Sequence, residues 1–205
     1  MRTKRSVLKP VFEAAIALLA LLLLSPLFLV IALAIVFNTG FPIFFSQPRV
    51  GQNGTLFNIL KFRTMRGVNH GPSITVGGDS RITPVGRILR KFKCDEIPQL
   101  WNVVRGEMSL VGPRPEVPQY VDIHNPLWRA VLKARPGITD PASIKYRDEE
   151  SVLAKAENPI DFYERVLLPT KLALNVAYLE KQTVWSDVQM ILQTIRCAVF
   201  PDGSK

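Results

Sequence analysis

The sequence predicts an α+β protein, mainly helical, in which a long hydrophobic segment precedes a compact domain that contains a β-hairpin. Three observations lead to this prediction. No charged residue occurs between Glu13 and Arg49. A strand-like run at 55–63 follows an Asn-Gly pair at 53–54, a common signal for a hairpin turn. The C-terminal third carries apolar residues at helical spacing.

The length and charge of the chain limit what it can be. Its 205 residues suffice for one membrane element and one compact cytosolic domain, which we place at residues 1–40 and 41–205. The 26 Lys and Arg residues outnumber the 17 Asp and Glu residues, so the net charge is +9. An excess of this size indicates polyanionic partners, such as phosphorylated substrates, anionic lipid head groups or nucleic acid.

Cysteine use indicates a protein that faces the cytosol. Cys94 and Cys197 are the only cysteines, and they lack the spacing of metal ligands. We therefore expect two reduced thiols and no zinc site.

The hydrophobic segment is interrupted at its centre. Its apolar part runs from Ala14 to Phe37, which is long enough for a transmembrane helix. Ser25-Pro26 lies in the middle, and a proline there leaves the Leu22 carbonyl without its helical partner, although the Ser25 hydroxyl can cover a freed carbonyl. Each half would then be about 16 Å long, half of a hydrocarbon core of ~30 Å.

Three interpretations of this segment compete. A cleavable signal peptide is disfavoured because the apolar run is too long and continues past the Ala-x-Ala pattern at 32–34. A kinked spanning helix and a re-entrant helix, which enters and leaves by the same face, both fit the proline. Basic residues on both sides pull both ends towards the cytoplasm, but the residues alone leave these two interpretations equally open. The basic residues are Arg2, Lys4, Arg5 and Lys9 before the run, and Arg49, Lys61, Arg63 and Arg66 after it.

Short elements joined by proline-rich turns follow the hydrophobic segment. Residues 44–65 predict a β-hairpin with its turn at Asn53-Gly54, in which Lys61 and Arg63 share one face. Thr83-Pro84 is typical of the N-cap and first residue of a helix. The other expected elements are a helix from Asp95 to Val104, a strand at 108–111 and a helix that begins near Asn125-Pro126.

The C-terminal third, from about residue 148, is predicted to be mainly helical. Ser186 with Gln189 has the form of a capping box, and an apolar stripe follows. Packing of this stripe against the domain is the favoured interpretation, because any surface helix needs one apolar face. The alternative is a helix that lies in the membrane interface. The stripe consists of Trp185, Val188, Leu192, Ile195 and Val199.

Two adjacent carboxylates, Asp95 and Glu96, form the candidate chemical centre. Acidic residues at a helix start often only offset the helix dipole, and this explanation suffices for most sequences. A pyrophosphate bound here would need neighbouring cations, and Asp95 at a helix start would keep a low pKa as a nucleophile or Mg²⁺ ligand. Helical neighbours point about 100° apart, so we expect one carboxylate to attack and the other to move a proton or orient the acceptor. The nearby cations are Arg87, Arg90, Lys91, Lys93, Arg105 and Arg114.

Six segments in a fixed order resemble those of a known family. The chain is similar over nearly its whole length to the bacterial sugar transferases, the monotopic phosphoglycosyl transferases, and its size is similar to that of the single-domain members. Any one segment is a weak signal, whereas the ordered set is highly specific. The segments are Lys61-Phe-Arg-Thr-Met65, Asp79-Ser-Arg-Ile-Thr83, Val85-Gly86 with Leu89-Arg90, Asp95-Glu-Ile-Pro-Gln99, Met108-Ser-Leu-Val-Gly-Pro-Arg-Pro-Glu116 and Arg135-Pro-Gly-Ile-Thr139.

The resemblance implies a two-step reaction with a covalent intermediate. Asp95 would attack the β-phosphate of a UDP-sugar, release UMP and carry the phospho-sugar. Polyprenyl phosphate, undecaprenyl in most bacteria, would accept it, with Glu96 assisting as the base and Mg²⁺ bound beside Asp95. Arg90 and Arg114 match positions expected to hold phosphate, with Lys61, Arg63 and Arg147 as secondary candidates.

The resemblance also favours the re-entrant anchor. The expected fold is then α+β, mainly helical, with a re-entrant helix-break-helix at Ser25-Pro26, a β-hairpin and amphipathic interfacial helices. The expected location is monotopic, on the cytoplasmic face of the bacterial inner membrane, with membrane lipid as a partner and no nucleic acid.

The chain departs from the family's commonest pattern at two places. Lys93-Cys94 stands where small or apolar residues often precede the carboxylate pair, and Asp140 stands where glycine is frequent. The second change is expected to reshape a loop near the nucleotide-sugar. Two alternatives stay open: a membrane-tethered basic binding module without catalysis, and a Mg²⁺-dependent pyrophosphate hydrolase. The sequence does not predict the sugar, the pathway, the oligomeric state or, beyond the resemblance, the division of roles between Asp95 and Glu96.

Overall fold

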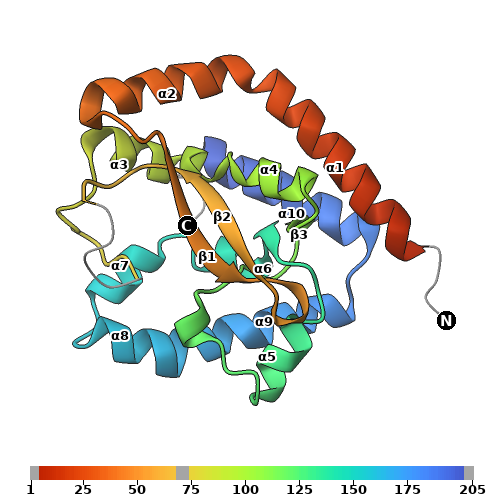
Figure 1. The fold of residues 1–205 in the computed structure, drawn as a ribbon. Coiled ribbons are helices and arrows are strands. Elements are labelled where there is room, and N and C mark those ends of the chain that lie inside the picture. Colours follow the sequence, from red (N-terminus) through yellow and green to blue (C-terminus); the bar gives the residue numbers. More distant parts are fainter. Residues whose placement is uncertain (1–4, 68–73, 201–205) are drawn as a thin grey trace.

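The computed structural model describes residues 5–67 and 74–200, with side chains from residue 8 onwards. The predicted basic flank at Arg2 and Lys4 therefore lies outside the described residues. A bent pair of helices lies across the top of the molecule, and short strands and helices form a domain beneath it (Figure 1). In chain order the elements are α1 (Arg5–Leu23), α2 (Ser25–Thr39), β1 (Phe44–Val50), η1 (Gln52–Gly54), β2 (Leu56–Phe62), α3 (Pro84–Lys91), η2 (Cys94–Glu96), α4 (Gln99–Val104), β3 (Ser109–Val111), η3 (Pro118–Tyr120), α5 (Pro126–Val131), β4 (Gly137–Thr139), α6 (Pro141–Lys145), α7 (Glu149–Ala154), α8 (Pro159–Phe162), η4 (Tyr163–Leu167), α9 (Leu168–Glu180) and α10 (Val184–Val199).

The break in the hydrophobic segment falls where the sequence predicts it. Within the described residues, no single helix is long and apolar enough to cross a membrane. The pair Leu8–Leu23 and Ser25–Thr39, bent by 62° at the break, has the combined length and composition of a broken span or a re-entrant loop. Pro26 cannot donate to the Leu22 carbonyl, and the Ser25 hydroxyl donates to that carbonyl at 2.8 Å. The bend therefore leaves no bare carbonyl at residue 22, as predicted.

One face of the bent pair packs on the domain, and the other is exposed. Ala17 of α1 is fully buried against Met108 and Val103, while Ile31 and Ile35 of α2 pack with Phe62 of the hairpin. The outward face is apolar, so this surface is suited to hydrocarbon rather than water. Its exposed residues include Leu19, Leu22, Leu23, Leu29, Val30, Leu33 and Phe37.

The predicted β-hairpin is confirmed. Strands β1 and β2 pair antiparallel, with Phe44 opposite Phe62 and Val50 opposite Leu56. Asn53 and Gly54 in the connecting turn have φ values of 56° and 79°, the left-handed conformation that an Asn-Gly pair adopts at low cost.

The second sheet brings two distant loops together. Strand β3, predicted at 108–111, pairs parallel with β4, with Ser109 opposite Gly137 and Val111 opposite Thr139. Parallel strands place their carboxyl ends at the same edge of a sheet, so the segments after Val111 and Thr139 start side by side. A hydrophobic core of α5, α7, η4 and α9 residues supports this part of the domain, with buried Trp128, Val131, Leu153, Tyr163, Leu167 and Leu172 among its members.

The predicted start of α3 is also confirmed. Thr83 is the N-cap, its hydroxyl accepts from the Gly86 amide at 2.8 Å, and Pro84 is the first helical residue. Gly86 lies directly against the backbone of Thr64, since a Cβ on Gly86 would come within 2.1 Å of the Thr64 oxygen. This close approach fixes α3 beside the end of the hairpin.

Two predictions for the C-terminal helix are wrong. The apolar stripe of α10 does not pack against the domain: Trp185 is 67% exposed and Leu192 59%, while Met190 and Asp187 face inward. Periodicity identifies the apolar face of a helix but not what covers it. The capping box is formed by Thr183 and Ser186 rather than by Ser186 and Gln189, because the helix begins at Val184.

Replacing Gly86 with alanine should test the contact between α3 and Thr64. The added methyl must push α3 or the hairpin end away, and overpacking of this kind typically lowers the free energy of unfolding by about 1–3 kcal/mol. Thermal unfolding of the purified protein measures the loss. Arg87→Ala is the matched control, since Arg87 is exposed on the same helix. Equal unfolding temperatures for Gly86→Ala and wild type would contradict the close approach.

Candidate active site

The carboxylate pair lies in a 3₁₀ turn rather than in the predicted helix from Asp95 to Val104. Lys93, just after the end of α3, has a φ of 55°, and this left-handed residue turns the chain into η2. Helix α4 begins only at Gln99, after Pro98. The prediction was wrong because a left-handed lysine gives no sequence signal of the kind that glycine or asparagine gives.

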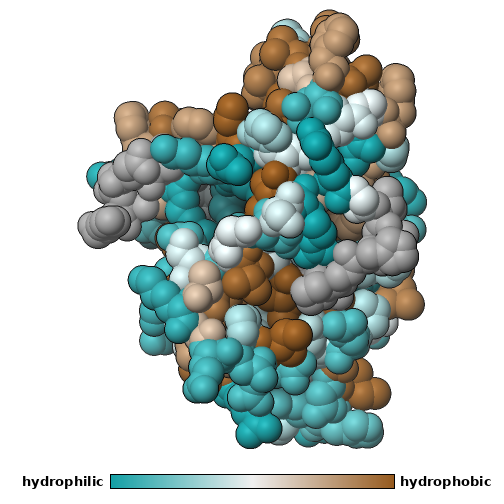
Figure 2. Space-filling view, turned by 90° about the vertical axis from the view of Figure 1, so that its left-hand side faces the viewer, coloured by the Kyte–Doolittle hydropathy of each residue, from teal (hydrophilic) through white to brown (hydrophobic). Residues whose placement is uncertain are grey.

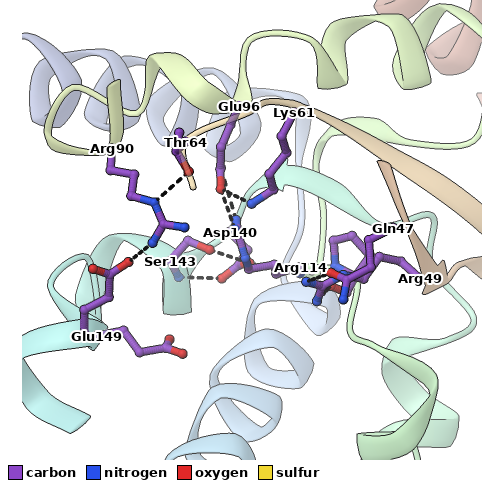
Figure 3. A network of polar contacts seen from close by, with 12 residues as sticks. Gln47, Arg49, Lys61, Thr64, Arg90, Glu96, Arg114, Asp140, Ser143 and Glu149 are labelled. Carbon is purple, nitrogen blue, oxygen red and sulfur yellow. Dashed lines mark hydrogen bonds and ion pairs between the residues drawn. The ribbon is translucent and has the colours of Figure 1, made fainter. Parts of the chain in front are cut away.

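Glu96 is held by two cations (Figure 3). Its carboxylate accepts from the Lys61 ammonium at 2.8 Å and from the two terminal nitrogens of Arg114 at 2.5 and 3.2 Å. The Arg114 contact is bidentate, the geometry in which guanidinium and carboxylate bind most strongly. Lys61 comes from β2 and Arg114 from the segment after β3, so Glu96 joins three parts of the chain.

Burial and these ion pairs together shift the pKa values of all three groups. Burial alone would raise the pKa of Glu96, but Arg114 and Lys61 outweigh it and hold that pKa well below its usual range. Glu96 in turn raises the pKa of Arg114 above its ordinary value. Burial lowers the pKa of Lys61, and the attraction of Glu96 only partly offsets this effect. Glu96 is therefore ionised at neutral pH.

Asp95 has the opposite environment. Its residue surface is only 6% exposed, and its Oδ1 atom is buried without a hydrogen-bond partner among the described residues. Burial, and then the negative charge of Glu96, raise the pKa of Asp95. The expectation of a low pKa at a helix start was wrong, because desolvation outweighs the helix terminus here. A buried carboxylate oxygen without a donor is unfavourable for folding and available to a ligand.

Arg90 lies beside this pair and is oriented from two sides. Its Nε donates to the Thr64 hydroxyl at 3.0 Å, and a terminal nitrogen contacts Glu150 of α7 at 2.6 Å. Arg90 is among the positive groups that act on the pKa of Asp95. An anion at the site would meet a guanidinium that Glu150 already orients.

Arg63 and Arg147, by contrast, contact backbone carbonyls at helix ends. Arg63 donates to the Thr39 hydroxyl at 2.7 Å and to the Gly40 carbonyl, just after α2. Arg147 donates to the carbonyls of Cys197 in α10 and of Lys91 in α3. The two side chains stabilise the negative ends of these helices. Arg63 thus contacts the end of α2, whereas Lys61 contacts Glu96.

A second ion network beside the site was not predicted. Arg49 donates to Glu116 at 3.0 Å, and the Tyr163 hydroxyl donates to the same carboxylate at 2.5 Å. Burial, followed by the charge of Glu116, raises the pKa of Tyr163. Tyr163 is 47 residues from Glu116 in sequence, so no local pattern could have identified the contact. The only sequence feature that could have drawn attention to Arg49 is its place on a predicted strand, as the first charged residue after the uncharged stretch.

The residues at Asp95 fit a magnesium ion that takes one carboxylate oxygen from the protein and its other ligands from substrate phosphates and water. Within residues 5–67 and 74–200, no cluster of three His, Cys, Asp or Glu side chains is suited to a metal. Mg²⁺ commonly binds through one or two carboxylates together with substrate phosphates and water. The partnerless Asp95 oxygen is a hard ligand of the required kind.

One face of the molecule carries both apolar and polar surface (Figure 2). Figure 2 shows hydrophobic residues gathered at the top of the molecule, where α2 lies in Figure 1, and a hollow with hydrophilic walls below them. The larger of the two cavities described, about 240 Å³, lies elsewhere, between α1 and β3, and is lined by Lys9, Glu13, Ser109 and Arg135 among others. Asp95 and Glu96 do not line it.

Comparison with known proteins identifies the family to which the chain belongs. Residues 4–201 match the family described as Bacterial sugar transferase. The chain is 36% identical over 201 residues to a UDP-glucose:undecaprenyl-phosphate glucose-1-phosphate transferase of Caulobacter vibrioides, covering 96% of this chain and 71% of that protein. It is 32% identical over 212 residues to the exopolysaccharide production protein ExoY of Sinorhizobium fredii, covering 94% and 86%.

A relative with another sugar in its name is similarly close. The UDP-N-acetylgalactosamine-undecaprenyl-phosphate N-acetylgalactosaminephosphotransferase of Aeromonas hydrophila is 34% identical over 197 residues, covering 92% of this chain and 43% of that protein. Overall identity therefore does not separate a glucose from an N-acetylgalactosamine substrate.

Replacing Asp95 with asparagine should stabilise the protein at neutral pH. The raised pKa of Asp95 means that its ionised form is less favourable in the folded than in the unfolded chain. Asparagine removes this penalty, and each kcal/mol gained raises the unfolding temperature by about 2–4 °C for a chain of this size. Below the ordinary Asp pKa of 3.8 both states are protonated, so the gain should disappear.

Asp79→Asn is the control for this measurement. The hydrogen bonds from Arg81 lower the pKa of Asp79, so its replacement should give no gain. A lower unfolding temperature for Asp95→Asn at neutral pH would contradict the assignment of an unfavourable buried charge.

Proposed function

The chain belongs to the bacterial sugar transferase family, and we propose that it transfers a sugar-1-phosphate from a UDP-sugar to undecaprenyl phosphate through a phospho-sugar carried on Asp95. UMP and undecaprenyl-diphosphate-sugar are the products. Such a reaction forms the first lipid-linked sugar in the assembly of a polysaccharide, and relatives are named for undecaprenyl-phosphate transfer and for exopolysaccharide production.

The contrast between the two carboxylates is the observation that carries the proposal. Glu96 is paired with two cations, whereas Asp95 has a buried oxygen without a partner. A nucleophile needs a free lone pair and weak solvation, which describes Asp95. Glu96 cannot attack without first leaving both Lys61 and Arg114.

In the first step, an Asp95 oxygen attacks the β-phosphorus of the UDP-sugar. The bond from that phosphorus to the bridging oxygen breaks, and UMP leaves with the electron pair. Arg90, Arg114 and Lys61 neutralise the phosphate oxygens, which is the main requirement of phosphoryl transfer. These cations lie at the site already oriented by carboxylates and a hydroxyl.

In the second step, an oxygen of undecaprenyl phosphate attacks the same phosphorus. The bond to Asp95 breaks, and the carboxylate is regenerated. Glu96 takes the proton when the acceptor phosphate carries one. A Glu96 held by Lys61 and Arg114 is a weak base, but incoming phosphate competes for both cations, and their withdrawal raises the pKa of Glu96. Substrate binding thereby prepares the base.

We place Mg²⁺ at Asp95 in this proposal. Asp95 would contribute one carboxylate oxygen and the substrate would contribute phosphate oxygens. When bound, the ion adds positive charge where the pyrophosphate develops negative charge. Arg63 and Arg147, proposed from sequence as phosphate ligands, are better suited to keeping α2, α3 and α10 in place, because they contact carbonyls at the ends of these helices.

The anchor is proposed to be re-entrant, with residues 1–40 as the membrane segment and 41–205 as the catalytic domain. The chain changes direction by 62° between the two helices. If the two arms enter the membrane symmetrically, each slopes at half that angle to the plane of the membrane. Arms of 15–16 residues then reach a depth of ~12 Å, less than half of a ~30 Å hydrocarbon core. The Lys9 ammonium contacts Asp187 of α10, so the start of α1 stays with the domain.

The exposed stripe of α10 supports the same placement. A helix with Trp185 and Leu192 exposed on one face has the form of an interfacial helix, with its apolar face in the head-group region. The cytoplasmic face is proposed because UDP-sugars are cytosolic substrates and because basic residues flank the anchor on both sides.

Intact-mass analysis should detect the proposed intermediate. Incubated with a UDP-sugar and Mg²⁺ but no lipid, the wild-type protein should gain the mass of one phospho-sugar and release one equivalent of UMP. Asp95→Asn should gain no mass. Glu96→Gln should keep the added mass and fail to pass it to undecaprenyl phosphate.

Two outcomes would contradict this mechanism. An adduct on Asp95→Asn would assign the nucleophile elsewhere. Continuous UMP release without lipid would indicate a hydrolase, since a transferase stops after one turnover when the acceptor is absent.

Cysteine accessibility should establish the topology. Single cysteines near residues 3 and 203, with Cys94 and Cys197 replaced by serine, should react with a membrane-impermeant maleimide from the cytoplasmic side alone. Activity of the cysteine-free protein is the control for folding. Labelling of the two positions from opposite sides would contradict a re-entrant anchor.

A further inference from the structure

We propose that Asp140 is a positioning residue for the proposed reaction, which holds the backbone of Arg114 so that its guanidinium can serve Glu96 and then the substrate phosphate. This inference rests on the proposed function. It concerns the residue directly after β4, and it is argued from the contacts of that residue in this chain.

The carboxylate of Asp140 contacts two parts of the chain (Figure 3). One oxygen accepts from the Arg114 backbone amide at 2.9 Å and from the Ser143 hydroxyl at 3.0 Å, and the other accepts from the Ser143 amide at 2.7 Å. Asp140 is 1% exposed, and both of its oxygens are satisfied. The side chain therefore links the start of α6 to the loop that carries Arg114.

Several hydrogen bonds hold the segments on either side of Arg114, including one from the Arg49 side chain to the Pro115 carbonyl at 3.2 Å, but the Arg114 amide itself has Asp140 as its acceptor. Pro113 and Pro115 flank Arg114 and have no amide hydrogen, so the Arg114 amide is the only backbone donor in the three residues. Before it, Gly112 donates to the Thr139 carbonyl at 3.0 Å, and Gly137 donates to the Pro113 carbonyl at 3.0 Å. The Asp140 carboxylate thus continues the ladder between the two segments one step beyond the end of β3 and β4.

A fixed backbone at Arg114 matters because its side chain must change partners. At rest the guanidinium binds Glu96 through two hydrogen bonds. The proposed reaction needs this guanidinium to turn towards phosphate and back. A fixed Cα keeps both partners within reach of the side chain. Glu96 first, and Asp140 to a smaller extent, raise the pKa of Arg114.

The variant Asp140→Asn distinguishes the hydrogen bond to the Arg114 amide from the capping of α6. Asparagine keeps one oxygen for the Ser143 amide, and asparagine is as good an N-cap as aspartate. Its amide group, however, turns a donor towards the Arg114 amide in place of an acceptor. Asp140→Ser is the second variant, since one hydroxyl oxygen can cap α6 but cannot also replace the second carboxylate oxygen.

We expect both variants to lower kcat for UMP release about tenfold, the loss that corresponds to one positioning hydrogen bond. The full-length protein would be assayed with a UDP-sugar, undecaprenyl phosphate and Mg²⁺. KM for the UDP-sugar should change less than kcat.

Asn158→Ala is the matched control, because Asn158 caps the short helix α8 through its side chain and does not contact the Arg114 loop. It should leave kcat and KM unchanged. If wild type releases no UMP, the proposed function fails. If wild type is active and both Asp140 variants keep its kcat, or raise KM for the UDP-sugar as much as they lower kcat, the positioning role is overturned while the function stands. Loss of folding in both variants would assign Asp140 to stability alone and equally overturn the proposal.

Discussion

The contact of Glu96 with Lys61 and Arg114 is the interaction on which the site depends. It joins the hairpin, the turn after α3 and the proline-rich loop after β3 at one buried carboxylate. Removing one member of a buried ion group commonly costs about 3–5 kcal/mol, because the remaining charge is left unpaired. The same arrangement places a negative charge next to Asp95, whose Oδ1 atom has no donor among the described residues. The ionised form of Asp95, the residue proposed to react, is therefore unfavourable in the folded protein.

The other cations around this centre are also oriented before any substrate binds. Arg90 is held by Thr64 and Glu150, and the backbone of Arg114 is held by Asp140. A phosphate that enters has to compete with protein carboxylates for these groups. Only a ligand with several negative charges close together gains enough to do so, which favours a pyrophosphate over a single anion. The proposed preparation of Glu96 as a base follows from the same competition.

Local rules predicted a large part of the fold. The Ser25-Pro26 break with its Leu22 carbonyl, the Asn53-Gly54 turn and the Thr83-Pro84 helix start all depend on residues within a few positions of one another, and all are confirmed. The errors concern surroundings. The pKa of Asp95 follows from burial by distant segments, and the exposure of the α10 stripe depends on which elements cover it. The roles of Asp95, Glu96 and the phosphate-binding cations come from family resemblance and the site's geometry, and they stay predictions.

The central claim is that two adjacent carboxylates differ because one is paired and the other is not. Carbon-13 NMR of side-chain carboxyls, assigned through the Asp95→Asn and Glu96→Gln variants, measures this difference directly. In the substrate-free protein we expect the Glu96 signal to titrate well below the ordinary Glu range and the Asp95 signal to titrate above the ordinary Asp range. Two carboxyls with ordinary pKa values, or the reverse order, would contradict the account.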